Sequence, residues 1–89
     1  MYAVFTVVQF DPGRNSAAVQ MLKDQLIPQL KQAPGFVRGT WFGDDESGHG
    51  VVVFETREQA EQTRQPVNSN VLDGVRVVRS DVYRIDAEA

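Results

Sequence analysis

Four segments of the chain carry the apolar, β-branched and aromatic residues that are typical of strands. The first runs from Tyr2 to Phe10 and stops at the turn-forming tripeptide Asp11-Pro12-Gly13. The others are residues 36–42, 51–54 and 75–85. The polar, glycine-rich residues 43–50 join the second and third segments, so we expect these two to pair as an antiparallel hairpin.

Between the first two predicted strands, apolar residues recur at spacings of three and four, the period of an amphipathic helix. They are Val19, Leu22, Leu26 and Leu30. Asn15 or Ser16 can cap the start of this helix. Pro28 lacks the N–H that would bond to the carbonyl of Asp24, so we expect it to kink the helix or to convert its last turn.

A second helix is predicted to begin after Thr56. Thr56 and Gln59 have the spacing of a capping box, in which each side chain accepts a hydrogen bond from a backbone amide that the helix leaves free. This helix is polar. We also expect it to be short, because Pro66 should bend or stop it. An irregular segment is expected over residues 68–70.

The predicted order of elements is βαββαβ. This order is typical of a ferredoxin-like α+β fold, with a four-stranded antiparallel sheet and both helices on one face. The length of 89 residues fits a single domain, residues 1–89. The last strand mixes polar and apolar residues on both of its faces, so we expect either a bulge near Ser80 or an extension of the strand past the edge of the sheet.

Both faces of the predicted sheet are apolar. In the first strand Ala3, Phe5 and Val7 point one way, while apolar residues also occupy most of the alternate positions. Because two helices can cover only one face, we expect the other to be covered by a second copy in a two-fold homodimer. Two alternatives stay open: the acidic C-terminal tail, otherwise expected to fray, could fold back over this face, or the face could lie in solvent.

Composition narrows the classes of function. The 12 acidic and 9 basic residues give a net charge of −3, without the basic face that a nucleic acid requires. The absence of cysteine excludes disulfides and thiolate metal sites. The apolar N-terminal segment is too short to span a bilayer and lacks a basic leader region, so we expect a cytoplasmic protein with no membrane partner. The acidic run at residues 44–46 lacks EF-hand spacing, and we expect neither a metal nor a cofactor.

Two stretches carry a resemblance to a known family. They are Ala33-Pro-Gly-Phe-Val-Arg-Gly-Thr-Trp-Phe42 and Gly50-Val-Val-Val-Phe-Glu-Thr-Arg-Glu-Gln-Ala60, separated by a short acidic loop. Together with the order of elements, they resemble the dimeric α/β-barrel superfamily and, within it, domains of the antibiotic biosynthesis monooxygenase group. The matching residues indicate a shared fold and not a shared reaction. They consist of Pro-Gly-Phe after a helix and of a strand that ends before a capped helix.

The resemblance implies a homodimer whose sheets pack face to face, with a small-molecule cleft between sheet and helices. It also implies an oxidoreductase, a cofactor-independent monooxygenase that acts on an aromatic or polyketide-like substrate. The alternative is a non-catalytic domain that binds a metabolite or only assembles, and a third interpretation is a haem-binding or haem-degrading protein. The Asn that characterised monooxygenases carry near the cleft has no counterpart on the first strand, where Gln9 is the nearest amide.

Three aromatic or imidazole residues are candidates for catalysis: Trp41, Tyr83 and His49. Trp41 could line an aromatic pocket, although a strand Trp is more often core, and Arg38 should point to the opposite face from it. His49 is the sole imidazole, yet its flanking glycines favour a solvated turn residue. Tyr83 and Arg79 share a predicted face with Asp81, so Trp41, Arg79 and Tyr83 are the candidates for substrate binding.

Overall fold

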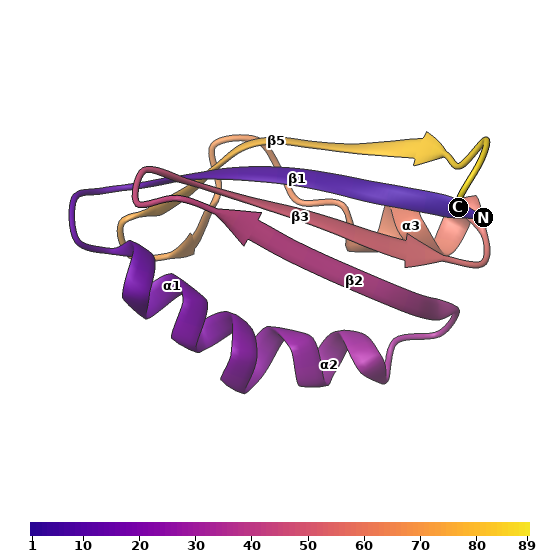
Figure 1. Cartoon of the computed structure of the whole chain (residues 1–89), viewed down its shortest axis with the longest axis horizontal. Coiled ribbons are helices and arrows are strands. Elements are labelled where there is room, and N and C mark those ends of the chain that lie inside the picture. Colours follow the sequence, from indigo (N-terminus) through magenta and orange to yellow (C-terminus); the bar gives the residue numbers. More distant parts are fainter.

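The computed structural model describes all residues, 1–89 (Figure 1). The strands are β1 (Tyr2–Phe10), β2 (Phe36–Gly43), β3 (Ser47–Phe54), β4 (Asn70–Leu72) and β5 (Val75–Arg84). The helical segments are α1 (Asn15–Met21), the π-helical turn η1 (Leu22–Leu26), α2 (Ile27–Lys31) and α3 (Arg57–Thr63). None of these helices is long and apolar enough to cross a bilayer.

The sheet has five strands in the order β2-β3-β1-β5-β4, and every pair is antiparallel. The prediction of an α+β fold is confirmed, and the arrangement is compatible with a ferredoxin-like fold. The prediction of four strands was wrong, because a fifth strand, β4, begins at Asn70, the last residue of the segment expected to be irregular, and continues to Leu72. Gly74, with φ of +79°, makes the turn that lets Asn70 and Leu72 pair with the start of β5.

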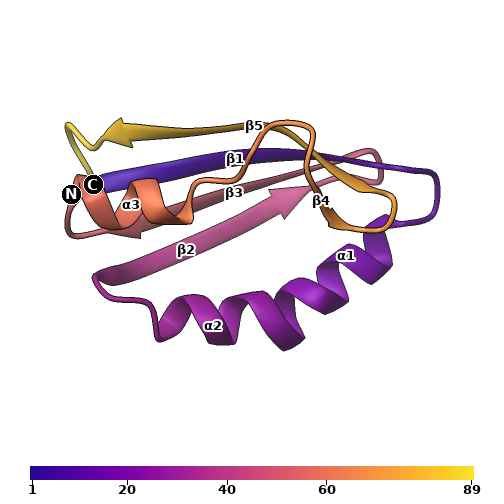
Figure 2. The same ribbon diagram turned by 180° about the vertical axis from the view of Figure 1, so that it is seen from behind.

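The α1–η1–α2 helix and α3 lie on the same face of the sheet (Figure 2). The hydrophobic core joins Leu30 of α2 and Ala60 of α3 to strand residues that point the same way, namely Val4, Val52 and Phe54. Phe54 packs edge to face against Phe36, with ring centroids 6.2 Å apart. The placement of both helices on one face, predicted from the order of elements, is therefore confirmed.

The first helix changes its hydrogen bonding just before Pro28. The Ile27 N–H donates to the carbonyl of Leu22, a spacing of five residues, so the π-helical turn η1 lies directly before α2. The last turn itself, which contains Pro28, stays α-helical, so the expected conversion of the last turn was wrong, and the irregular turn lies before the proline. The predicted cap was wrong: Arg14 occupies the N-cap without a side-chain hydrogen bond, and Asn15 donates to Asp45 instead.

The capping box and the bulge are both confirmed. The Gln59 N–H donates to Thr56 Oγ1 at 3.2 Å, and the Thr56 N–H donates to Gln59 Oε1 at 3.1 Å. On β5 the pairing with β1 shifts between Arg79 and Val77, which leaves Val78 as the extra residue, two positions before Ser80.

The C-terminal tail folds back instead of fraying. The Ile85 N–H donates to the Met1 carbonyl at 3.0 Å, and Glu88 forms an ion pair with Arg38 on β2. The tail thus folds back, as one alternative held, but its contacts lie only at one end of the apolar face.

Candidate functional site

The face of the sheet turned away from the helices is called here the open face. It carries three rows of side chains that run across β5, β1, β3 and β2: Tyr83, Ala3, Val53 and Arg38; Asp81, Phe5, Val51 and Thr40; and Arg79, Val7, His49 and Phe42. Val53 is the one buried side chain among them, and Phe42 is 53% exposed. The apolar side chains Phe5, Val7, Val51 and Phe42 therefore lie uncovered by any helix on the open face.

Three rings stack across the open face. The Phe42 and His49 rings are nearly parallel, with centroids 5.3 Å apart, and the His49 and Phe5 centroids are 6.2 Å apart at an interplanar angle of 29°. The Arg79 guanidinium lies 5.9 Å from the Phe5 centroid on the next strand. We call this set, Phe42, His49, Phe5 and Arg79, the ring ladder.

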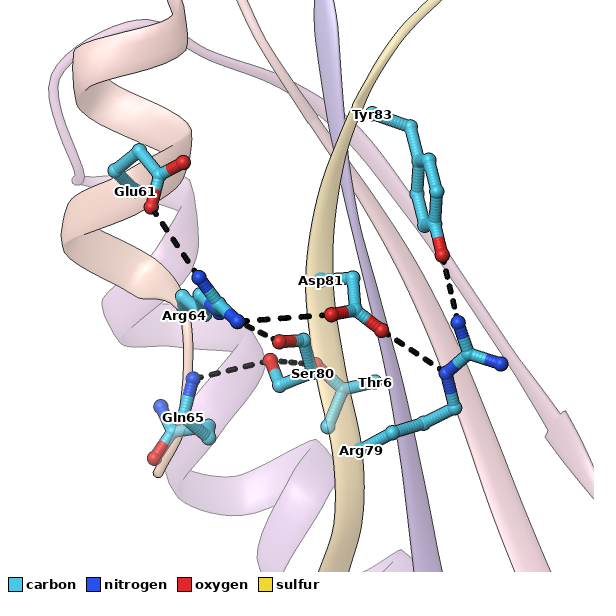
Figure 3. A network of polar contacts seen from close by, with 8 residues as sticks. All are labelled: Thr6, Glu61, Arg64, Gln65, Arg79, Ser80, Asp81 and Tyr83. Atoms are coloured by element: carbon cyan, nitrogen blue, oxygen red, sulfur yellow. Dashed lines mark hydrogen bonds and ion pairs between the residues drawn. The ribbon is translucent and has the colours of Figure 1, made fainter. Parts of the chain in front are cut away.

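Arg79 also joins a polar cluster at the β5 end of the ladder (Figure 3). Its Nε donates to Asp81 Oδ2 at 3.0 Å, and its Nη2 donates to the Tyr83 hydroxyl oxygen at 2.6 Å. The hydrogen bond to Asp81, with the electrostatic effects of Tyr83 and Asp81, raises the pKa of Arg79 above its already high ordinary value. The guanidinium is thus held as a fixed cation beside an aromatic ring.

A second arginine supports this cluster from the helix side. Arg64 follows α3 and donates from Nε to the Ser80 carbonyl at 2.6 Å, while its Nη2 lies 3.6 Å from Asp81 Oδ1 (Figure 3). The buried Ser80 hydroxyl accepts a hydrogen bond from the Gln65 N–H and is also hydrogen-bonded to the Thr6 hydroxyl. Asp81 therefore lies between two arginines, which fixes its position on the edge of β5.

Trp41 lies on the other face of the sheet, against the core. Its indole covers two glycines: a Cβ on Gly39 would come within 2.4 Å of the ring, and a Cβ on Gly50 within 2.8 Å. The structure confirms that Arg38 and Trp41 point to opposite faces. It does not bring Trp41 together with Arg79 and Tyr83, so the three predicted substrate-binding residues do not form one site.

His49 is a strand residue, and its expected place in a solvated turn was wrong. The connection between β2 and β3 is shorter than predicted because the Asp44 carboxylate accepts from the backbone N–H of both Glu46 and Ser47 at 2.8 Å. These hydrogen bonds lower the pKa of Asp44, with Ser47 as the larger cause. The Nδ1 of His49 is buried and has no hydrogen-bond partner.

Sequence reasoning did not nominate Phe5 or Phe42 as site residues. Their signal was the alternation that places both on the face opposite Trp41, but alternation alone does not show that their rings flank His49. That neighbourhood depends on the strand order, which puts β3 between β1 and β2.

A polar hollow of about 490 Å³ lies at the opposite end of the sheet from the tail. It is lined by side chains of the β1 end and of the β4–β5 hairpin, among them Gln9, Asp11, Asn70, Asp73 and Arg76. Arg76 donates to Gln9 at 2.6 Å across it. Because small aromatic ligands favour mostly apolar pockets, this hollow is a poor candidate for such a ligand.

Comparison with protein-family models and with curated proteins finds no match for this chain.

Proposed function

We propose that the chain forms a two-fold homodimer through the open face and binds a small aromatic ligand. The observation that carries the proposal is the apolar centre of this face, formed by Phe5, Val7, Val51 and Phe42, which no helix covers. Charged residues flank it, Arg38 on β2 and Arg79 and Asp81 on β5. An apolar centre with a polar rim is the usual anatomy of an interface between protein chains.

Native mass spectrometry and sedimentation velocity at micromolar concentration test the dimer. The wild-type protein should be dimeric, and Phe42→Asp should be monomeric because it would bury a charge in the interface. The matched control is Val19→Asp, which changes a side chain 44% exposed on α1 and should leave the dimer intact. A monomeric wild-type protein would refute the proposal.

Arg79 and Tyr83 are the residues we propose for holding the ligand. A fixed guanidinium with free N–H donors, beside the Phe5 ring, suits a ligand that combines an aromatic system with an oxygen acceptor. Native spectra should then show an added mass that denaturation removes. We expect Arg79→Ala and Tyr83→Phe to lose this added mass, whereas Trp41→Phe on the other face should keep it.

The reaction proposed from the resemblance is a cofactor-independent monooxygenation. Without a cofactor, the substrate must supply all four electrons, as when dioxygen converts an activated methylene group to a carbonyl group and its second oxygen atom leaves as water with both methylene hydrogens. An oxygen electrode with an activated diaryl methylene compound should show one dioxygen consumed per carbonyl formed and no peroxide. The triple variant Trp41→Phe, Tyr83→Phe and His49→Ala changes every residue proposed for catalysis. If it still turns over the substrate, none of these residues is catalytic.

A second candidate function is a non-catalytic domain that binds a metabolite or only assembles. The packing of Trp41 favours it, because the indole fills the space above Gly39 and Gly50 that a substrate could otherwise use. A bound mass without oxygen consumption would select this candidate. The geometry does not favour the haem interpretation, because the His49 ring is stacked between the Phe5 and Phe42 rings and its Nδ1 is buried.

A further inference from the structure

The last residues of the chain cross one end of the open face. The Ile85 N–H donates to Met1 on β1, and Glu88 pairs with Arg38 on β2, three strands away from β5 in the sheet (Figure 1). Three strand spacings amount to about 14 Å, and four extended residues span about 13 Å. The backbone of residues 85–88 therefore falls short of β2, and Figure 1 shows the C-terminus beside the start of β1. The long side chains of Glu88 and Arg38 bridge the remaining distance, beside Val53.

The burial of Val53 supports this path. Val53 is only 2% exposed, although it points to the same open face as Val51, which is half-buried, and Phe42, which is 53% exposed. No helix packs on this face, so the tail is the segment available to cover Val53. The rows that the tail does not cross keep their exposure.

We propose that residues 85–89 act as a strap that occupies the Val53 row and competes with the second copy for it. This inference rests on the proposed dimer. In a face-to-face dimer the Val53 row would lie against the partner, so each strap must open before the two sheets can meet over their full length. The Arg38–Glu88 ion pair holds the strap in place. Because about half of each side chain is exposed to solvent, this ion pair is weak enough to open reversibly.

Glu88→Gln tests the strap through the dimer dissociation constant. Loss of one exposed ion pair changes an equilibrium by up to about fivefold, and two straps open per dimer, so we expect the dimer to tighten by about two- to thirtyfold. The matched control is Asp86→Asn, which removes the same charge from the same tail but breaks only a pair with Arg84. This control should leave the dissociation constant unchanged.

A second measurement tests whether the strap covers Val53, and it does so in the monomer. Because the chain has no cysteine, Val53→Cys introduces a single thiol beneath the strap. At concentrations where the protein is monomeric, this thiol should react slowly with a maleimide, and the added change Glu88→Gln should speed the reaction severalfold. Adding Asp86→Asn instead should not.

The outcomes separate the two proposals. If Glu88→Gln raises the dimer dissociation constant, or gives the same dissociation constant as Asp86→Asn, the strap does not compete with the second copy. If thiol labelling is equally fast with and without Glu88→Gln, the strap does not cover Val53, whatever the dimer does. If every variant is monomeric but labelling responds to Glu88→Gln, the dimer proposal fails while the covering of Val53 stands.

Discussion

At the scale of single residues, Trp41 owes its position to two glycines. Gly39 precedes it by two residues on β2, and Gly50 pairs with it across β3, so the indole lies flat over backbone that has no side chain. Neither glycine has a positive φ, so these positions need glycine for space and not for backbone conformation. The sequence predicted the face of Trp41 from strand alternation. It could not predict the cover over Gly50, because that contact depends on the pairing register.

We predict that Gly50→Ala destabilises the fold by about 1–3 kcal/mol, because the new methyl group would force the indole out of its place. Urea denaturation followed by far-ultraviolet circular dichroism measures this loss, because Trp41 is the only Trp and a variant without it has no Trp fluorescence. Combined with Trp41→Phe, the same substitution should cost less than the sum of the two single changes, since the smaller ring leaves room for the methyl group. Additive losses would show that Trp41 does not depend on Gly50.

At the scale of elements, the β2–β3 hairpin shows why a turn is harder to predict than a strand. The apolar runs on either side identified the hairpin, but the glycines and acidic residues between them suggested a long loop. One side chain shortens it: Asp44 caps two backbone N–H groups, and the strand then resumes at Ser47. Because the chain re-enters the sheet early, His49 becomes part of the open face.

Asp44→Ala should lower the stability of the fold at neutral pH, and the loss should disappear in acid. The native pKa of Asp44 lies below its ordinary value of 3.8, so the carboxylate contributes fully above that value and loses its contribution as the pH falls through the lower native pKa. Urea midpoints at pH 7 and in strong acid measure the difference. Glu46→Ala, which removes a neighbouring carboxylate that makes no side-chain hydrogen bond, is the control and should cost little stability at pH 7.

At the scale of the whole molecule, hydrophobic periodicity predicted the order of elements and the layer of helices on one face. It missed β4, because a three-residue strand in a polar segment has no periodic pattern, and its pairing depends on the turn at Gly74. The apolar open face was predicted as well, but the rows, the ring ladder and the strap arise from strand order. That order brings together residues far apart in the sequence.

We predict that thermal unfolding of the wild-type protein depends on its concentration. If folding and dimerisation are coupled, a tenfold increase in protein stabilises the dimer by about 1.4 kcal/mol and raises the unfolding midpoint. Calorimetry over two decades of concentration measures this shift. Phe42→Asp should unfold at one temperature throughout, and a concentration-independent midpoint for both proteins would contradict coupling.

The central position of β1 has a consequence for how the chain acquires its fold during synthesis. β1 is made before both of its neighbours, β3 and β5, and its Thr6 hydroxyl meets Ser80, 74 residues later. The β2–β3 hairpin can form locally, but β1 gains its second neighbour only after residues 75–84 have been made. Until then β1 presents an open apolar edge, so the nascent chain depends on whatever shields that edge at the ribosome exit.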